Sequence, residues 1–440
     1  CAETGRKNSL IVVSGDGARR FNFLTYELAK QPGNLTQNAV NLLTHILDAA
    51  EGRIGEQGAD PFWKSATGEL LSHAIDMLWR AHGRLTLADL VRLIDERPQT
   101  TAEVTDAAWQ ASSFWAATMD RLMGIGERPV HPLDDRTVSL IFSYFARTLG
   151  NPEHQKTVGS VVHTLTANLS RLLKGTLHDL FCTTTNLVPE YSFDGAVIVI
   201  DLPVVRYHED GILAAHIWKY LWQRAVMARS IEKTTRPVVC WADECQFFLS
   251  SNDALFVSNS RAQRACSVYI TQNLPTYYSR IVARNPADVA DSLIGNFATK
   301  VFHANSDERT NRYAAELIGK GLQRRYSQSG GRNAGLSDGT STQAGGNSSW
   351  GNSFGQHGGG GNRSSGSSWG EGSTRGTSQG TQEGWGVSEQ VDYHVQPAEF
   401  ASLAKGGRQH AGIVEAFLHR GGQPFRHTGL NHLPLRFRQS

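Results

Sequence analysis

Short apolar runs that alternate with segments of helical spacing constrain this chain more than any other feature. Residues 196–200 and 238–242 are unbroken apolar runs rich in Val and Ile, and residues 268–271 form a third run. Between them, residues 212–229 and 253–265 have the apolar spacing of helices. Strands that are apolar along their whole length are typical of parallel sheets covered on both faces. The alternation therefore predicts an α/β fold with a mostly parallel sheet and helices on both faces.

The pattern extends in both directions along the chain. Residues 298–303 read as a strand between two helical segments, 286–294 and 307–318, and Gly319 is placed to end the second one. Residues 9–13 are a further apolar run. We therefore expect the sheet to begin near the N-terminal end of the chain.

Residues 35–187 differ, because only helical patterns occur there. Asp60 followed by Pro61 is typical of a helix start. Thr86 with Asp89 resembles a capping box. Since a strand precedes this region and further strands follow it, we expect an all-helical domain inserted into the sheet.

Glycine and serine dominate residues 321–390, where 20 Gly and 14 Ser leave almost no aliphatic side chains. Such a composition buries too little apolar surface to offset the entropy of ordering, so we expect a disordered or very mobile segment. Its isolated aromatic residues leave open a second role, contact with DNA bases or a partner protein. These residues are Trp350, Phe354, Trp369 and Trp385.

The last segment, 391–440, reads as compact. Residues 410–418 and 433–437 are predicted strands that complete the sheet. From residue 401 onward the chain has six Lys or Arg but the single acid Glu415. A phosphate-binding face is therefore the alternative to a solvated strand pair.

Composition narrows the class of protein. The 43 basic and 41 acidic residues give a net charge of +2, which excludes a strongly basic chromatin-type protein. The five cysteines form no CxxC pair, which indicates a reducing compartment. No apolar run is long enough to span a bilayer. The chain begins at Cys1 without a Met, so we expect it to continue a longer protein that carries any membrane anchor.

The strongest chemical signal is an apolar strand that ends in Asp243 and Glu244, the Walker B arrangement. Ligands bind at the carboxyl ends of parallel strands in open α/β sheets. The Asp243 carboxylate is placed to hold Mg²⁺, usually through water. The Glu244 carboxylate is placed to polarise the water that attacks the γ-phosphate of ATP. A pair of solvated acids at a strand end is the alternative.

Two further residues extend this hypothesis. Gln272 follows the next predicted strand, so it would lie beside the two acids and sense the γ-phosphate or orient water. A polar strand-end cap is its alternative role. Arg261 lies between the two strands and could reach a nucleotide on an adjacent subunit as an arginine finger; an ordinary surface arginine is the alternative.

Together these motifs resemble the C-terminal part of TraG/TraD-type coupling proteins of conjugative type IV secretion systems. The motifs carrying the resemblance are 195–203, Trp241 to Glu244, Arg261, 270–272, 293–301, 307–310, 317–319, Glu399 with Phe400, Leu403, and Gly406 with Gly407. In front of the helical region, Arg6 and residues 21–24 are similar to the stretch that follows the P-loop in that family. The wider group includes the HerA/FtsK-like DNA pumps.

The resemblance implies a RecA-like ATPase that uses ATP and Mg²⁺ and forms a homo-hexamer. It implies a protein on the cytoplasmic face of the bacterial inner membrane that binds DNA, single- or double-stranded, without strong sequence preference. Its partners would be the relaxase and other relaxosome proteins and the secretion channel. The all-helical domain would face the relaxosome or the incoming DNA. By the same resemblance Asp243 is the Mg²⁺-binding acid, Glu244 the catalytic one, Gln272 the sensor and Arg261 the finger acting between subunits.

One motif of the family does not occur. The sequence contains no G-x-x-x-x-G-K-[ST], the loop whose amides and lysine hold the phosphates. We therefore expect the P-loop to precede Cys1 in a longer protein, and this chain alone to be inactive. Two other functions stay open: a type IV secretion assembly ATPase of the HerA-like group, and a non-catalytic adaptor for DNA or the relaxosome on the same fold.

The predicted organisation has five segments. They are 1–34, the start of the nucleotide-binding domain; 35–187, the all-helical insert; 188–320, the RecA-like core; 321–390, the Gly/Ser-rich segment; and 391–440, the strands that complete the domain.

Overall fold

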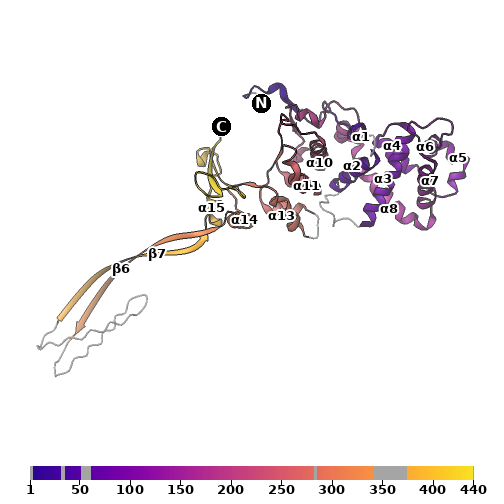
Figure 1. The fold of residues 1–440 in the computed structure, drawn as a ribbon. Helices are drawn as coiled ribbons and strands as arrows, with labels where there is room; N and C mark the ends of the chain where they lie inside the picture. The colour runs from indigo at the N-terminus through magenta and orange to yellow at the C-terminus, as the bar shows by residue number, and fades with distance from the viewer. Residues whose placement is uncertain (1–2, 31–34, 51–60, 282–284, 340–373, 440) are drawn as a thin grey trace. The chain divides into compact units, whose positions relative to one another are not determined.

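The computed structural model describes residues 3–30, 35–50, 61–281, 285–339 and 374–439. The chain divides into two compact units, of which one comprises Cys1–Lys300 with Arg420–Gly422 and the other Val301–His419 with Gln423–Ser440 (Figure 1). No helix in these described ranges is both long and apolar enough to cross a bilayer.

Two pairs of parallel strands form the β-structure of the first unit. Strand β1 (Leu10–Val13) pairs with β2 (Val197–Ile200), and β3 (Val238–Ala242) pairs with β4 (Ala265–Tyr269). Each pair is a two-stranded sheet of its own within the described residues. The parallel pairing predicted from the apolar runs is confirmed, and the carboxyl ends of β3 and β4 lie side by side.

Side chains of β3 alternate between a buried and an open face. Val238 and Ala242 are buried, and Val238 packs in a cluster with Phe256, whereas Trp241 is 68% exposed. A continuous apolar run predicts cover on both faces, so the structure differs here. Among the described residues of the first unit, none covers the face that carries Trp241.

The region between β1 and β2 is helical throughout, with no strand among its described residues. Because β1 and β2 are hydrogen-bonded neighbours, this region is inserted between two adjacent strands, as the sequence predicted. Its helices are α1 (Phe23–Lys30), α2 (Leu35–Ala50), α3 (Pro61–His82), α4 (Leu87–Asp95), α5 (Ala107–Ser112), α6 (Phe114–Leu122), α7 (Asp135–Ser143), α8 (Gln155–Leu172) and α9 (Gly175–Phe181).

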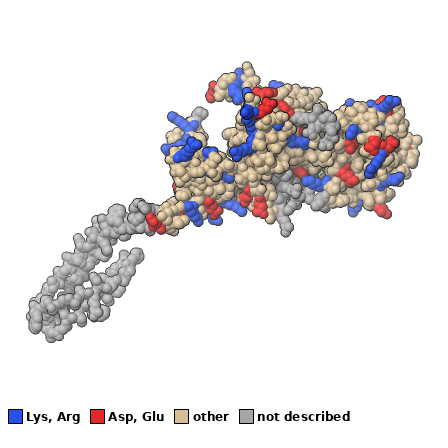
Figure 2. Space-filling view, viewed as in Figure 1, with Lys and Arg blue, Asp and Glu red and all other residues tan. Residues whose placement is uncertain are grey.

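Side-chain caps explain several of these helix starts. Thr86 accepts a hydrogen bond from the amide of Asp89, which confirms the predicted start of α4. Ser113 and Asp134 cap α6 and α7 in the same way. Basic and acidic side chains are interspersed on the face of this region that Figure 2 shows, so no single-sign surface marks a nucleic-acid site there.

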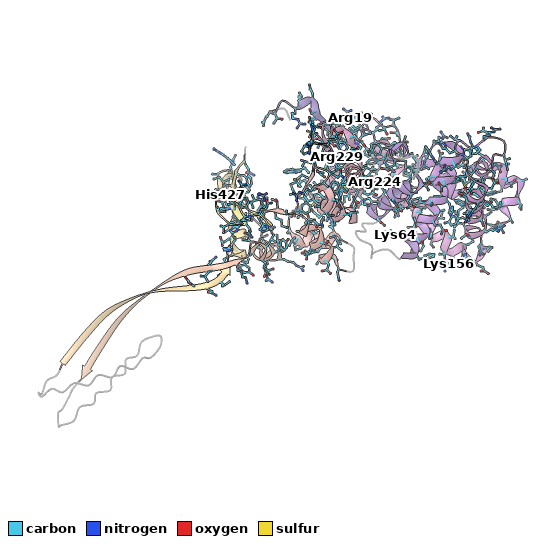
Figure 3. The ribbon with its side chains drawn as sticks, viewed as in Figure 1. Arg19, Lys64, Lys156, Arg224, Arg229 and His427 are labelled. Atoms are coloured by element: carbon cyan, nitrogen blue, oxygen red, sulfur yellow. The ribbon has the colours of Figure 1, made fainter. Side chains whose placement is uncertain are left out.

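Helix α10 (Val204–Ala228) follows β2 and connects the insert with the β3–β4 pair. It begins eight residues before the predicted start, and His208 kinks its first turns with a φ of 49°. Arg224 of α10 (Figure 3) donates a 3.0 Å hydrogen bond to Glu27 of α1. The remaining helices of this unit are α11 (Ser251–Ser260), α12 (Leu274–Arg280) and α13 (Pro286–Gly295).

The second unit holds a three-stranded sheet in the order β5–β8–β9. Its strands are β5 (Thr299–His303), β8 (Ile413–Arg420) and β9 (His432–Arg438), and β8 and β9 are antiparallel. Helices α14 (Glu308–Ile318) and α15 (Pro397–Ser402) pack beside it, and Phe400 is fully buried in their shared core. The predicted strands of the C-terminal segment therefore form, next to β5.

The ends of the Gly/Ser-rich segment differ from the prediction of disorder. Strands β6 (Lys320–Gly339) and β7 (Thr374–Tyr393) pair antiparallel along their whole length. Residues 340–373, with Trp350, Phe354 and Trp369, lie outside the described residues. The prediction rested on side-chain burial, whereas this pair is defined by the hydrogen bonds of its backbone.

Candidate active site

Asp243 and Glu244 stand directly after β3, where the chain turns sharply. The backbone pairing continues past the strand ends, because Ile270 N donates to Ala242 O at 2.9 Å and Cys245 N donates to Ile270 O at 3.0 Å. Glu244 has a left-handed backbone with a φ of 48° and caps the 3-10 turn η6 (Cys245–Phe248). A non-glycine residue in this conformation is strained, and such strain gathers at functional sites.

The Glu244 carboxylate is held by two amide groups. Gln272 Nε2 donates to Oε1 of Glu244 at 3.2 Å from the end of the neighbouring strand β4. Gln246 Nε2 donates to the other oxygen, Oε2. The structure thus brings Gln272 and Glu244 together, as the parallel arrangement predicted, while their roles in hydrolysis stay a prediction. The two amides fix the direction in which the carboxylate points.

Asp243 presents an exposed carboxylate beside Glu244, whose amide donates to Asp243 Oδ1 at 3.0 Å. Carboxylate oxygens are the ligands that Mg²⁺ prefers, and this ion is usually held by one or two carboxylates while it keeps several waters. Within the described ranges no group of three or more metal-ligating side chains occurs. The two carboxylates of Asp243 and Glu244 therefore fit Mg²⁺ as a ligand set.

Arg261 lies at the opposite end of the β3–β4 pair. It follows α11 immediately and precedes β4, whose first residue Ala265 pairs with Val238, the first residue of β3. The five residues of each strand separate this end from Glu244 by roughly 16 Å along the chain direction. The structure does not bring Arg261 to the two acids of its own chain.

Arginines and backbone carbonyls crowd this opposite end. Arg229 Nη2 donates to Gln263 O and, at 3.1 Å, to Arg264 O. Arg264 Nη1 donates to the carbonyls of Lys233 and Thr235. Burial, together with the nearby positive charge of Arg264, lowers the pKa of Arg229. The two ends of the strand pair thus differ in charge, with acids at the carboxyl ends and guanidiniums at the amino ends.

The cysteines near the site are structural. Burial raises the pKa of Cys240 and of Cys245 to about 12, so both remain thiols near neutral pH. The Cys245 sulfur lies 2.9 Å from the hydroxyl of Tyr277 on α12, which anchors the start of η6. Neither thiol is suited to nucleophilic or metal chemistry.

A buried polar cluster behind the strand ends was missed from the sequence. It consists of Lys219 and Gln223 on α10, Asp253 on α11 and Tyr269 at the end of β4. In the sequence, Asp253 indicated only the start of a helix. The signal that could have found the cluster is the pair Lys219 and Gln223, four residues apart within an otherwise apolar stretch of a buried helix.

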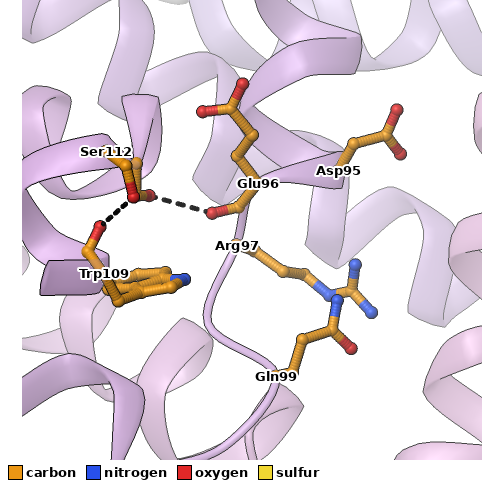
Figure 4. Close-up of a pocket in the computed structure, with 7 residues that line it drawn as sticks. Asp95, Glu96, Arg97, Gln99, Trp109 and Ser112 are labelled. Carbon is orange, nitrogen blue, oxygen red and sulfur yellow. Dashed lines mark hydrogen bonds between the residues drawn. The ribbon is translucent and has the colours of Figure 1, made fainter. Parts of the chain in front are cut away.

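A small hollow of about 210 Å³ lies in the helical insert, away from these residues (Figure 4). Its lining has both signs of charge, and the buried Arg97 uses one guanidinium nitrogen to donate to Ile94 O at 3.0 Å. Because this small space is lined by both acidic and basic side chains, the lining does not indicate a particular class of ligand. The hollow is lined by Asp95, Glu96, Arg97, Gln99, Trp109, Ser112 and Ser113.

Known proteins resemble the chain in two ways. A protein-family model described as the TraM recognition site of TraD and TraG matches residues 237–357, which include β3, the two acids, β4 and Gln272. No curated protein matches the sequence. Among solved structures, the unbound bacterial conjugative coupling protein TrwBdeltaN70 is 12% identical with a TM-score of 0.53, covering 98% of this chain and 74% of that chain.

Two nucleotide complexes of the plasmid coupling protein TrwB are similar to the same degree. The complex with the ATP analogue ADPNP has a TM-score of 0.52 and 12% identity, covering 98% of this chain and 75% of that chain. The complex with the GTP analogue GDPNP has a TM-score of 0.52 and 11% identity, and the match covers 98% of this chain and 74% of that chain. The predicted α/β fold class is confirmed. The match over residues 237–357, on a chain with the fold of a coupling protein, confirms the resemblance to TraG/TraD-type coupling proteins that the motifs predicted.

Proposed function

We propose that this chain is part of an ATP-driven coupling protein that binds DNA and links the relaxosome to the channel of a conjugative type IV secretion system. The observation that carries the proposal is the hydrogen bond from Gln272 to Glu244 at the carboxyl ends of two parallel strands. Ligands of open α/β sheets bind at this edge. A carboxylate oriented by neutral amides is suited to accept a proton from an attacking water.

Each residue has a distinct role in this mechanism. Glu244 accepts the proton of the attacking water, and Gln272 holds the carboxylate and senses the γ-phosphate. Asp243 would hold Mg²⁺, which would supply neutralisation of the charge on the phosphates. The phosphate loop would come from a segment that precedes Cys1 in the whole protein.

A ring of six copies accounts for the position of Arg261. Acids at one end of the β3–β4 pair and arginines at the other make the two ends complementary in charge. A head-to-tail contact between such unlike surfaces generates a closed ring when the rotation closes. Arg261 of one subunit would then stabilise the charge that develops on the nucleotide of its neighbour.

Partners and location follow from the same proposal. The family matched by residues 237–357 is described as a TraM recognition site, so we assign recognition of a relaxosome protein to this region. DNA would be bound through its phosphates without strong sequence preference. The whole protein would sit on the cytoplasmic face of the inner membrane, anchored by a segment outside this chain.

The test is Glu244→Gln in the whole protein. We expect ATP binding to be kept and the kcat of hydrolysis to fall on the order of 10²-fold or more, because the amide accepts no proton. Glu153→Gln, a change at an exposed acid of the helical insert, serves as the matched control and should leave kcat unchanged. Normal hydrolysis by the Glu244→Gln protein would remove the catalytic assignment. A whole protein that binds DNA and relaxosome proteins but no ATP would instead be the adaptor.

A further inference from the structure

A buried ion pair joins α10 to the helix that follows the candidate site. Lys219 Nζ lies 2.5 Å from Asp253 Oδ2, and the two side chains are 5% and 0% exposed. Lys219 also lies over the rings of Phe248 and Tyr269, at 5.6 and 5.9 Å from their centroids. A pair so deeply buried is rigid, because neither charge can turn to water without moving its surroundings.

Asp253 is the centre of this cluster, and its two oxygens accept five hydrogen bonds. Oδ1 accepts from Tyr269 at 2.6 Å and from Gln223 at 2.8 Å. Oδ2 accepts from Lys219 and from the amide and hydroxyl of Ser250. Although burial opposes ionisation, Lys219 and these donors hold the pKa of Asp253 below its ordinary value. The carboxylate therefore joins α10, α11 and the end of β4 at one point.

Lys219 makes one more contact, which reaches the candidate site itself. Its ammonium donates to the backbone carbonyl of Phe248, the last residue of turn η6. That turn begins at Glu244, whose left-handed backbone is unfavourable on its own. At the other end of the turn, Cys245 is held by Ile270 O and Tyr277.

We propose that Lys219 is a positioning residue for Glu244, fixing the turn 244–248 from its far end while Asp253 holds the ammonium in place. The inference rests on the proposed function, because only that proposal makes Glu244 a catalytic residue. A strained backbone persists only where its surroundings over-determine it. Lys219 supplies that constraint from α10, whereas Gln272 and Gln246 orient only the side chain.

If Lys219 and Asp253 only stabilised the fold, replacing both by neutral side chains would leave the turn 244–248 unchanged. Buried ion pairs can often be replaced by neutral groups without loss of fold. Lys219→Met alone leaves Asp253 charged without its partner, so this variant can fail to fold. Lys219→Met with Asp253→Asn removes both charges and is the variant that decides.

The matched control is the second ion pair on the same helix. Arg224 pairs with Glu27 at 3.0 Å, and Glu27 is buried as well. This pair faces α1 and donates nothing to turn η6. Arg224→Met with Glu27→Gln therefore removes a comparable pair without touching the candidate site.

The first measurement is amide hydrogen exchange on this chain. In the Lys219→Met/Asp253→Asn variant we expect exchange at the amides of 245–249 to rise about 10-fold or more, with β3 and the middle of α10 unchanged. The control variant should leave 245–249 at the wild-type rate. Wild-type exchange in this turn for the deciding variant would overturn the proposal.

The second measurement is hydrolysis by the whole protein. We expect kcat to fall about 10-fold or more in the deciding variant with the KM for ATP unchanged, because the phosphates are held elsewhere. Unchanged kcat would also overturn the positioning role. If the wild-type protein hydrolyses no ATP, the proposed function fails, and the exchange result still decides whether Lys219 fixes the turn.

Discussion

The side-chain amide of Gln272 lies 3.2 Å from Oε1 of Glu244, across the ends of two parallel strands. The register of the pair places them there, because Ala242 and Tyr269, the last residues of β3 and β4, are direct partners. Each strand is followed by a polar residue within three positions. The contact therefore depends on the strand pairing, and a slip of one residue would abolish it.

Gln272 and its neighbour Asn273 should separate function from stability. Gln272→Ala in the whole protein removes a hydrogen bond to a charged group, so we expect kcat to fall roughly 10-fold to 100-fold. Asn273 instead caps α12 by accepting from Thr276 N at 3.0 Å. Asn273→Ala should lower the free energy of unfolding by about 1 kcal/mol and leave kcat unchanged. Steady-state kinetics and urea unfolding distinguish the two, and equal effects of both variants on kcat would contradict this division.

Glycine at position 244 should relieve backbone strain while it removes the carboxylate. A left-handed conformation costs a non-glycine residue roughly 1–2 kcal/mol, and the entropy of glycine in the unfolded chain offsets about half of that. We expect Glu244→Gly to have a free energy of unfolding up to about 1 kcal/mol higher than that of Glu244→Ala, because both variants lose the hydrogen bonds of the carboxylate and only alanine keeps the strain. Asp243 does not have a positive φ, so Asp243→Gly should be less stable than Asp243→Ala by about 0.5–1 kcal/mol. Urea unfolding of the four variants measures these differences, and a Glu244→Gly protein no more stable than Glu244→Ala would show that the turn is not strained.

Arg261→Ala should act across subunits. We expect the whole protein with this change to hydrolyse ATP poorly, and a mixture with the Glu244→Gln protein to recover part of the activity. In a mixed ring, some sites combine an intact Glu244 with an intact Arg261 from the adjacent subunit. Hydrolysis is measured as a function of the mixing ratio. Absence of recovery at every ratio would count against an arginine finger acting between subunits.

Stability should fall as the pH is lowered from about 6.5 toward 4, in part because of His45. Burial, and then the positive charge of Lys219, lower the pKa of His45 from its ordinary value of 6.5 to about 4. Between these values the unfolded chain binds the proton and the folded chain does not, so stability is present at higher pH and lost on acidification. The full loss attributable to His45 is about 3 kcal/mol.

A variant with an unchanged ring contact isolates this effect. His45 stacks on Tyr220 at 3.8 Å, so His45→Phe keeps an aromatic ring and removes the titrating group. We expect unfolding measured between pH 4 and 7 to show a smaller slope in His45→Phe, with the remainder due in part to the buried His216. The assignment fails if His45→Phe keeps the wild-type slope.

The sequence predicted the strands and helices because their periodicities are local. It also predicted the meeting of Glu244 and Gln272, because parallel strands that end in polar residues must place them at one edge. It did not predict the ion pair of Lys219 and Asp253, because 34 residues separate them and long-range pairing leaves no local pattern. The strand pair β6–β7 was missed for a related reason, since backbone pairing leaves little trace in glycine-rich sequence.

Helix α10 contributes to two hydrophobic clusters at once. Ile217 and Leu221 belong to the core of the helical insert, and Val226 packs with Val238 of β3 and Phe256 of α11. Helix α10 therefore packs against the insert along one part of its length and against the strands along another. Excising the insert would leave an apolar stripe of α10 in water, so the two parts should melt in a single transition. A partner that binds the insert and makes it more rigid would therefore also slow local opening at the strand ends.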